Sequence, residues 1–207
     1  MNNEMYSCKN GEMHITGCRI SLYPMKDKYA EQILKSVKEN NTEAVWKKTD
    51  LFSTLYRGKS PSVVDAAASL FINAYEYNTH LVGEFTFSKG CPGDSSGDNF
   101  LNTSEVKPNN ETNKANGDFI IDCKYSFYAF GEDDYMNEIE KIVGISEIHG
   151  MNPRSEHYVT ILSGTANQLF AYFESVLEYA HNHLSHYVLE ATLSVNSPSK
   201  KELYSHE

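Results

Sequence analysis

Hydrophobic and polar positions alternate between a strand period and a helix period, and the same order of periods occurs twice along the chain. In the first half, alternation over 16–23 predicts a strand, and apolar residues at helical spacing over 27–40 predict a helix. Short strands follow over 44–47 and 51–57. A second helix, opened by Pro61 at its first turn, runs to about Tyr77, and a last strand covers 80–88. The predicted order is β-α-β-β-α-β.

The second half repeats this order. Its predicted strands cover 119–128, 150–152, 157–162 and 186–195, and its predicted helices cover 133–143 and 165–181. A shift of 106 positions aligns residues 50–92 with 156–198 without a gap and gives ten identities. The identities include Thr54 with Thr160, His80 with His186 and Glu84 with Glu190. The chain is therefore interpreted as two copies of one unit.

This order of elements is typical of the ferredoxin-like fold, in which two helices cover one face of a four-stranded antiparallel sheet. We predict an α+β protein with tandem ferredoxin-like repeats at 13–94 and 118–199, joined by a flexible linker at 95–117. The linker is rich in Gly, Asn, Ser and Asp, which favour turns. Each predicted sheet leaves one face open, so a second chain could cover it, and homo-oligomerisation is a hypothesis.

Composition restricts the partners. The 207 residues carry a net charge of −10, which argues against a nucleic-acid-binding face and against docking on anionic lipid. No apolar run approaches the length of a membrane span, and the first residues do not resemble a secretory signal. Four scattered cysteines without metal-ligand spacing are typical of free thiols in a reducing compartment. We therefore expect a cytoplasmic protein without direct membrane insertion.

Catalytic and metal motifs are not visible: the sequence contains no nucleophile elbow, HExxH, P-loop or GxGxxG. His181, His183 and His186 cluster in the second copy, but capping and surface roles explain them better than a metal site. Cys18 and Cys123 occupy equivalent strand positions, where a small core residue is a simpler interpretation than a reactive thiol. We expect no enzyme, no metal and no cofactor.

Polar residues kept in both copies are more informative. The last strands keep a His, a Glu, a Thr and a Ser at matching positions, and the third strands keep Thr54 and Thr160. Threonine is a good strand former, so packing alone could explain part of this pattern. The alternative is a polar pocket with aromatic walls, present once in each repeat, which would suit a planar heteroaromatic ligand.

Several segments carry a family resemblance. They are Ser21-Leu22-Tyr23-Pro24-Met25, the region from Val45 to Gly58, the string Gly90-Cys91-Pro92-Gly93-Asp94-x-x-Gly97-Asp98 and the closing Leu193-Ser194-x-Asn196-Ser197-Pro198-Ser199. They resemble the YkoF family of thiamin- and hydroxymethylpyrimidine-binding proteins over about residues 14–199. The resemblance implies tandem ferredoxin-like domains, a homodimer, a ligand pocket in each repeat, and a role beside the uptake or salvage of the thiamin pyrimidine, with a possible transport-system partner.

Carried over by position, the resemblance places Leu22 and Thr54 in the first pocket, and Phe127 and Thr160 in the second. Asp50 and Glu84, together with Glu156 and Glu190, are candidate partners for the ligand's amine or for the thiazolium charge. The copies differ at these walls, which predicts unequal affinities. The predicted function is non-catalytic binding of thiamin or its hydroxymethylpyrimidine moiety. The alternatives are a structural or regulatory dimerisation module and, last, an enzyme acting on a thiamin precursor.

Overall fold

The strands of both repeats join in one continuous sheet. The computed structural model describes residues 15–89, 101 and 105–199. The first repeat contributes β1 (Ile15–Pro24), β2 (Trp46–Thr49), β3 (Thr54–Lys59) and β4 (Leu81–Lys89). The second contributes β5 (Ile120–Phe130), β6 (Arg154–Glu156), β7 (Val159–Thr165) and β8 (His186–Val195). The helices are α1 (Tyr29–Glu39), α2 (Ser60–Ala74), α4 (Glu111–Lys114), α5 (Tyr135–Ile148) and α6 (Ala166–His183).

The α+β class and the two repeated units are confirmed, but the prediction of separate four-stranded sheets is wrong. All eight strands pair in the order β2-β3-β1-β4-β8-β5-β7-β6. The last strands of the two repeats, β4 and β8, pair antiparallel from Leu81↔Val195 to Ser88↔Val188. Pairing satisfies the backbone groups that each strand would expose as the edge of a smaller sheet.

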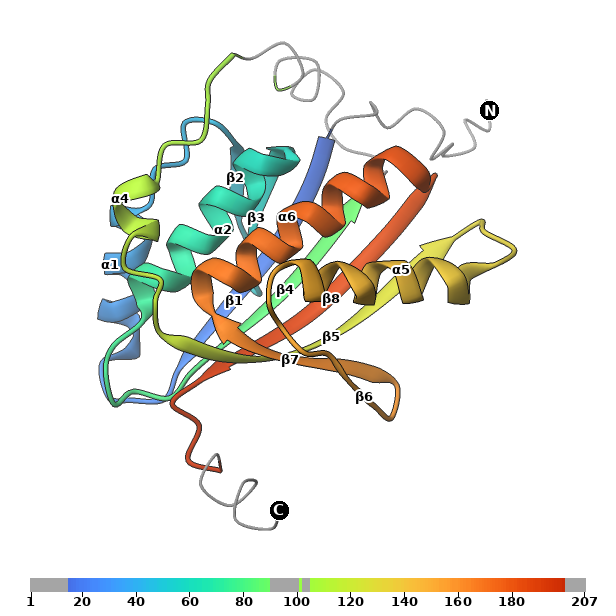
Figure 1. Cartoon of the computed structure of the whole chain (residues 1–207). Coiled ribbons are helices and arrows are strands. Elements are labelled where there is room, and N and C mark those ends of the chain that lie inside the picture. Colours follow the sequence, from blue (N-terminus) through green and yellow to red (C-terminus); the bar gives the residue numbers. More distant parts are fainter. Residues whose placement is uncertain (1–14, 90–100, 102–104, 200–207) are drawn as a thin grey trace.

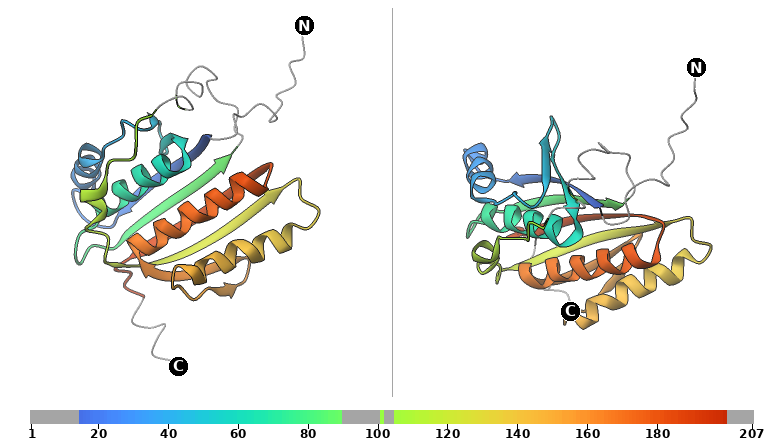
Figure 2. Two further views of the ribbon diagram at one scale, coloured as in Figure 1. Left: turned by 45° about the horizontal axis from the view of Figure 1, so that its top comes forward. Right: turned by 90° about the horizontal axis from the view of Figure 1, so that it is seen from above.

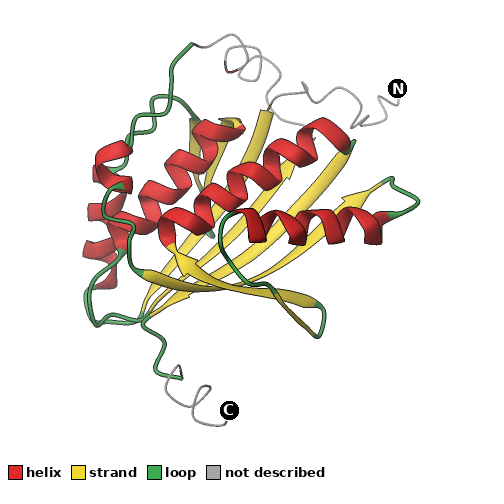
Figure 3. Cartoon of the chain, in the orientation of Figure 1, coloured by secondary structure: helices red, strands yellow, loops and turns green. Residues whose placement is uncertain are grey.

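The helices lie on one face of this sheet (Figure 1, Figure 3). The long helices α2 and α6 lie side by side over the centre, and α1 and α5 flank them toward the two ends of the sheet (Figure 2). In the part of the chain that the structure describes, no helix covers the opposite face. This bare surface is called the open face below. No helix among the described residues is long and apolar enough to cross a membrane.

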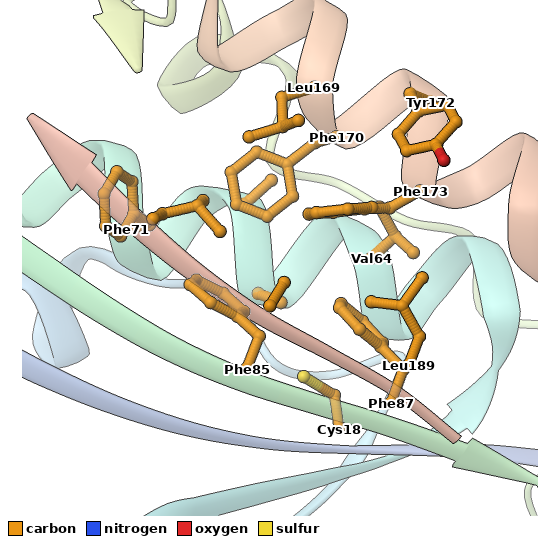
Figure 4. Packing of buried hydrophobic residues seen from close by; sticks show 14 of the residues in the cluster. Cys18, Val64, Phe71, Phe85, Phe87, Leu169, Phe170, Tyr172, Phe173 and Leu189 are labelled. Atoms are coloured by element: carbon orange, nitrogen blue, oxygen red, sulfur yellow. The ribbon is translucent and has the colours of Figure 1, made fainter. Parts of the chain in front are cut away.

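The two repeats share one hydrophobic core between α2, α6 and the central strands. Phe85 and Phe87 of β4 project toward the helices, where Phe170 and Phe173 of α6 meet them (Figure 4). The ring centroids of Phe85 and Phe170 are 5.7 Å apart, and those of Phe87 and Phe173 are also 5.7 Å apart. All four rings are at most 2% exposed. Aromatic side chains of the second repeat therefore complete the core of the first.

A glycine allows this close packing at one position. Gly83 of β4 lies directly beneath Phe71 of α2, and a Cβ atom at residue 83 would approach the Phe71 ring to 2.7 Å. The equivalent position in β8 is Leu189, and the residue equivalent to Phe71 is Leu177. The first repeat thus pairs a glycine with a large ring, and the second pairs two leucines.

Helix α1 shows a departure from its sequence pattern. It begins at Tyr29 after Lys28, two residues later than the predicted start at residue 27. An amphipathic helix normally buries its apolar stripe. Here Gln32 and Ser36 are buried, whereas Leu34 is 67% exposed and Val37 is 38% exposed.

Part of the connection between the repeats is fixed to the first repeat. The Asn110 amide donates a hydrogen bond to Asp65 of α2 at 2.6 Å and another to the carbonyl of Asn41 at 2.8 Å. Lys114 of α4 lies 3.4 Å from the Asp65 carboxylate, which is almost completely buried. Residues 90–100 and 102–104, which include the Gly90-Cys91-Pro92-Gly93-Asp94 string, lie outside the described residues.

Candidate functional site

Four of the six residues expected to bind ligand lie on the helix-covered side of the sheet. Thr54 pairs with Ile20 across β3 and β1, and Thr160 pairs with Tyr125 across β7 and β5. These two registers are equivalent in the repeats. Leu22 and Phe127 are each two residues further along β1 and β5, so they share the face of Ile20 and Tyr125. The structure therefore brings together Leu22 with Thr54, and Phe127 with Thr160.

The hydroxyl group of Thr54 is accessible, so a ligand can replace its present hydrogen-bond partner. Its hydroxyl lies 3.0 Å from the hydroxyl of Thr49 on β2, in an exposed contact at the outer part of the sheet. Both Thr54 and Leu22 are half-buried. Leu22 packs against the edge of the core, and part of its side chain remains accessible. A hydroxyl and an aliphatic side chain are thus both accessible at the same end of the first repeat.

The equivalent region of the second repeat is more filled. Thr160 is within hydrogen-bonding reach of Tyr125, whose hydroxyl lies 2.7 Å from that of Tyr172 on α6. Burial raises the pKa of Tyr125 above its usual value. Phe127 is 5% exposed and stacks on Tyr187 with ring centroids 5.9 Å apart. The first repeat has Ile20 and Ala66 where the second has Tyr125 and Tyr172.

The first helix of each repeat carries apolar residues at matching positions. Ile33 and Val37 of α1 correspond to Ile139 and Val143 of α5. None of the four is fully buried, although Ile139 and Val143 touch the rim of the core. Apolar side chains that stay accessible at equivalent positions on two helices indicate a contact surface for a ligand or a partner.

Asp50 and Glu84, the other two expected ligand residues, belong to the opposite side. Asp50 lies in the β2–β3 turn and accepts a 2.7 Å hydrogen bond from Arg19, which projects from the open face. That bond, with two backbone N–H donors from Phe52 and Ser53, lowers the pKa of Asp50 to about 2. Glu84 is exposed on β4 and accepts a hydrogen bond from Tyr23. The six residues therefore do not form one site, and neither carboxylate reaches the threonines.

The retained polar residues of the last strands gather on the open face instead. Strand pairing places Arg19, Thr86, Glu190 and Ser126 in one row across four strands. The neighbouring row contains Ser21, Glu84, Thr192 and Lys124. The duplication relates the two rows. Each contains a cation, a threonine, a glutamate and a serine in that order, starting at β1 in the first row and at β5 in the second. A shallow cavity of about 330 Å³ lies over them, lined in part by Glu84, Glu190 and Lys124.

The two cationic positions of these rows differ in their surroundings. Arg19 is held by Asp50 and by Ser53, whose hydroxyl is 2.6 Å away. The residue equivalent to Ser53 is Val159, which cannot hydrogen-bond Lys124. Lys124 is exposed and lines the cavity together with Val159.

Comparisons with known proteins were made for the whole chain. The model of the YKOF-related family matches residues 15–94 and 120–200, which are the two repeats. The chain belongs to this family. A curated relative from Bacillus subtilis (strain 168), named "Putative HMP/thiamine-binding protein YkoF", is 36% identical over 191 residues. That alignment covers 92% of this chain and 95% of the relative.

The name of that relative describes a binding protein, while the metal and thiol chemistry of this chain follows from its described residues. Among them, no group of three or more His, Cys, Asp or Glu side chains is placed to hold a metal ion. Cys18 and Cys123 are completely buried free thiols, and burial raises the pKa of each far above the ordinary value. The interpretation of these cysteines as core residues is confirmed, since a thiol in that state is unreactive.

For this YkoF-related chain, sequence reasoning missed the face on which each candidate lies. Strand alternation contained part of the signal, because Leu22 follows Cys18 and Ile20 by even steps whereas Glu84 falls between Gly83 and Phe85. The reasoning also missed a buried polar cluster around Thr16 and His181, described below. The duplication could have revealed that cluster, because the equivalent residues are Ile121 and Tyr75.

Proposed function

We propose that the protein is a non-catalytic binder of the hydroxymethylpyrimidine moiety of thiamin, with one site in each repeat. The sites would include Leu22 and Thr54 in the first repeat, and Phe127 and Thr160 in the second. The carrying observation is the equivalent placement of Thr54 and Thr160 on the helix-covered side, each paired with a buried residue of the first strand in its repeat. The name of the Bacillus subtilis relative supports the choice of ligand.

The chemistry of the aminopyrimidine suits such a position. Its ring needs an apolar wall, for which Leu22 or Phe127 is available, and its polar edge needs one or two hydrogen-bond partners. The threonine hydroxyl and nearby backbone groups supply them. A ligand donor left without a partner in a desolvated site would cost about 1–3 kcal/mol. Family membership and the free buried cysteines favour a cytoplasmic role beside uptake or salvage of the pyrimidine, with a transport system as a possible partner.

Protection against thermal unfolding tests this proposal, because a ligand that binds only the folded state must raise the unfolding midpoint. Hydroxymethylpyrimidine and thiamin should both protect the wild-type chain. Thr54→Val should reduce the protection while leaving the unliganded midpoint nearly unchanged. Thr86→Val on the open face is the matched control and should respond like the wild type. Absence of protection at millimolar ligand, with the folded state verified by circular dichroism, would contradict the proposal.

The open face favours a second candidate function, a structural or regulatory dimerisation module. Its two rows contain two cations and two glutamates, so that a second copy of the same face offers partners of opposite charge. We propose that this face joins two chains in a homodimer. Charge reversal at Glu190→Lys should then lower the association constant measured by sedimentation, whereas Glu140→Lys on α5 should not. A dimerisation module without a thiamin-related ligand would show the first effect and no thermal protection.

A further inference from the structure

The interface between the repeats has two ends, and the duplication makes them comparable. At one end, Tyr75 of α2 stacks on Phe119 with ring centroids 3.8 Å apart. Ala166, Leu81 and Ile121 are fully buried beside it. The first amides of α6 are satisfied by the segment just before β5, with Ala166 N donating to the Phe119 carbonyl at 3.0 Å and Asn167 N to the Gly117 carbonyl at 3.1 Å. This end, called the apolar seam below, is closed by hydrophobic packing.

The other end, called the polar seam, holds different residues at every equivalent position. Thr16 replaces Ile121, Ser60 replaces Ala166, His181 replaces Tyr75 and Tyr187 replaces Leu81. The Thr16 hydroxyl is the hub: it lies 2.8 Å from the Ser60 hydroxyl, contacts His181 Nε2 and lies 3.4 Å from the Tyr187 hydroxyl. Thr16 itself is completely buried. Burying hydroxyls costs free energy that apolar packing avoids.

The polar seam also ties a lysine to the end of α6. Lys89 at the end of β4 donates hydrogen bonds of 3.0 Å to the carbonyls of His181 and Leu184. Its partial burial lowers the pKa of Lys89. Lys89 thus supplies hydrogen bonds to carbonyls at the end of α6, where a helix leaves its last carbonyls without intrahelical partners. His181 is held through its side chain by Thr16 and through its backbone carbonyl by Lys89. These residues form the floor of the polar seam, and their positions are fixed before any ligand binds.

A cavity of about 700 Å³ opens directly above this floor. Its walls include Ser60 and Pro61 from α2, and Glu174, Glu178 and His181 from α6. Glu174 and Glu178 are one helical turn apart and face the same space, against a single lysine, Lys59. Burial raises the pKa of Glu174; Lys114 partly opposes this shift, and Glu178 adds to it. A carboxylate that is partly removed from water gains when a cation is added beside it.

The acidic character continues beyond this cavity. Glu174 also lines an adjoining cavity of about 340 Å³ between α2, α4 and α6, whose walls include Glu111, Val64 and Ala68. Lys114, the cation there, is already paired with Asp65 and Glu111. The surface between the two long helices therefore offers carboxylates separated by aliphatic side chains.

We infer that the polar seam is a binding site for a small aliphatic ammonium compound. Its ammonium group would contact Glu174 and Glu178, its methylene groups would lie against Pro61, and hydroxyl groups, where present, would reach the Ser60 side of the floor. The apolar seam shows that the fold closes without these polar side chains, so packing does not require them. This site is separate from the residues assigned to the pyrimidine and does not depend on that assignment.

Putrescine is a suitable probe, and 1,4-butanediol is its neutral counterpart. At constant ionic strength, putrescine should raise the thermal unfolding midpoint of the full chain in a saturable way, and butanediol should not. Glu174→Gln with Glu178→Gln should weaken the apparent affinity for putrescine about tenfold or more, because two charge-assisted hydrogen bonds are lost. The matched control, Glu140→Gln with Glu147→Gln, removes the same charge from exposed positions of α5 and should keep the wild-type affinity.

Two results would overturn this inference. The first is a putrescine response that is absent from the wild type, or equal in both double variants, since either leaves no role for the polar seam. The second is a loss of hydroxymethylpyrimidine affinity in Glu174→Gln with Glu178→Gln without a loss of putrescine affinity. That second result would make the cavity part of the pyrimidine site. Failure of hydroxymethylpyrimidine to bind any variant concerns the proposed function alone.

Discussion

At the scale of single residues, Thr54 and Thr160 have the same register but different neighbours. Thr54 has only Thr49 beside its hydroxyl, in an exposed contact. Thr160 is next to the buried pair formed by Tyr125 and Tyr172. A ligand at Thr160 must therefore compete with a protein hydroxyl for the threonine, and it has less space.

We accordingly predict that the Thr54 site binds hydroxymethylpyrimidine more tightly than the Thr160 site. Titration calorimetry should resolve two classes of site, and Thr54→Val should remove the tighter class. Thr160→Val should remove the weaker one. The opposite order would mean that the filled second repeat is the better site, which its two buried tyrosines oppose.

Asp50 gives a prediction about pH. Its pKa in the folded chain is lowered from 3.8 to about 2, first by the hydrogen bond from Arg19 and then by the backbone donors of Phe52 and Ser53. A lowered folded-state pKa means that this stabilisation is fully present above pH 4 and is lost as the pH falls toward 2. Asp50→Asn should therefore lower the thermal midpoint at pH 7 by a small amount, and this difference should vanish near pH 2. A difference that is independent of pH would exclude the carboxylate as its source.

At the scale of elements, the sequence pattern predicted every helix and strand of the two repeats, with boundaries displaced by a few residues. The largest displacements are the end of α5, which is at Ile148 and not at 143, and β6, which is at Arg154–Glu156 and not at 150–152. Period alone could not show that β4 and β8 join, because the alternation of a paired strand and of an edge strand is the same. It also could not assign Asp50 or Glu84 to a face before the register was known.

Helix α1 is the element for which the pattern was misleading. Its spacing correctly indicated a helix, but tertiary packing buries the polar side. Asn40, at its end, donates hydrogen bonds to the Tyr56 hydroxyl at 3.1 Å and to the Ala66 carbonyl at 2.9 Å. Two acceptors in the first repeat thus depend on one amide.

These contacts predict that two truncations of similar size lower the free energy of unfolding by different amounts. Asn40→Ala should cost about 1–3 kcal/mol of unfolding free energy, because it removes two buried hydrogen bonds. Leu34→Ala should cost less than about 1 kcal/mol, because this leucine is 67% exposed. Urea denaturation measures both. A loss of 2 kcal/mol or more for Leu34→Ala would mean that the apolar stripe of α1 is packed, as its spacing alone implied.

At the scale of the whole molecule, the two copies share one sheet and one hydrophobic core. Phe170 and Phe173 from the second repeat complete the layer over Phe85 and Phe87 of the first. The repeat was visible in the sequence, but this sharing was not, since an internal repeat is equally compatible with separate cores.

Unfolding should therefore be a single transition. Phe173→Ala should cost about 3–5 kcal/mol, and it should lower the midpoint seen by Trp46 fluorescence as much as the midpoint seen by far-ultraviolet circular dichroism. Trp46 is the only tryptophan and belongs to β2 of the first repeat, so it reports on the half that lacks the substitution. An unchanged fluorescence midpoint would indicate independent units.

The central claim is that each repeat carries one site for hydroxymethylpyrimidine, centred on equivalent threonines. Calorimetric titration of the full chain with this ligand tests it most directly, through the number of molecules bound. The account predicts two per wild-type chain, one for Thr54→Val, one for Thr160→Val, and two for the open-face control Thr86→Val. Two bound molecules in all four proteins, or none in the folded wild type, would contradict it.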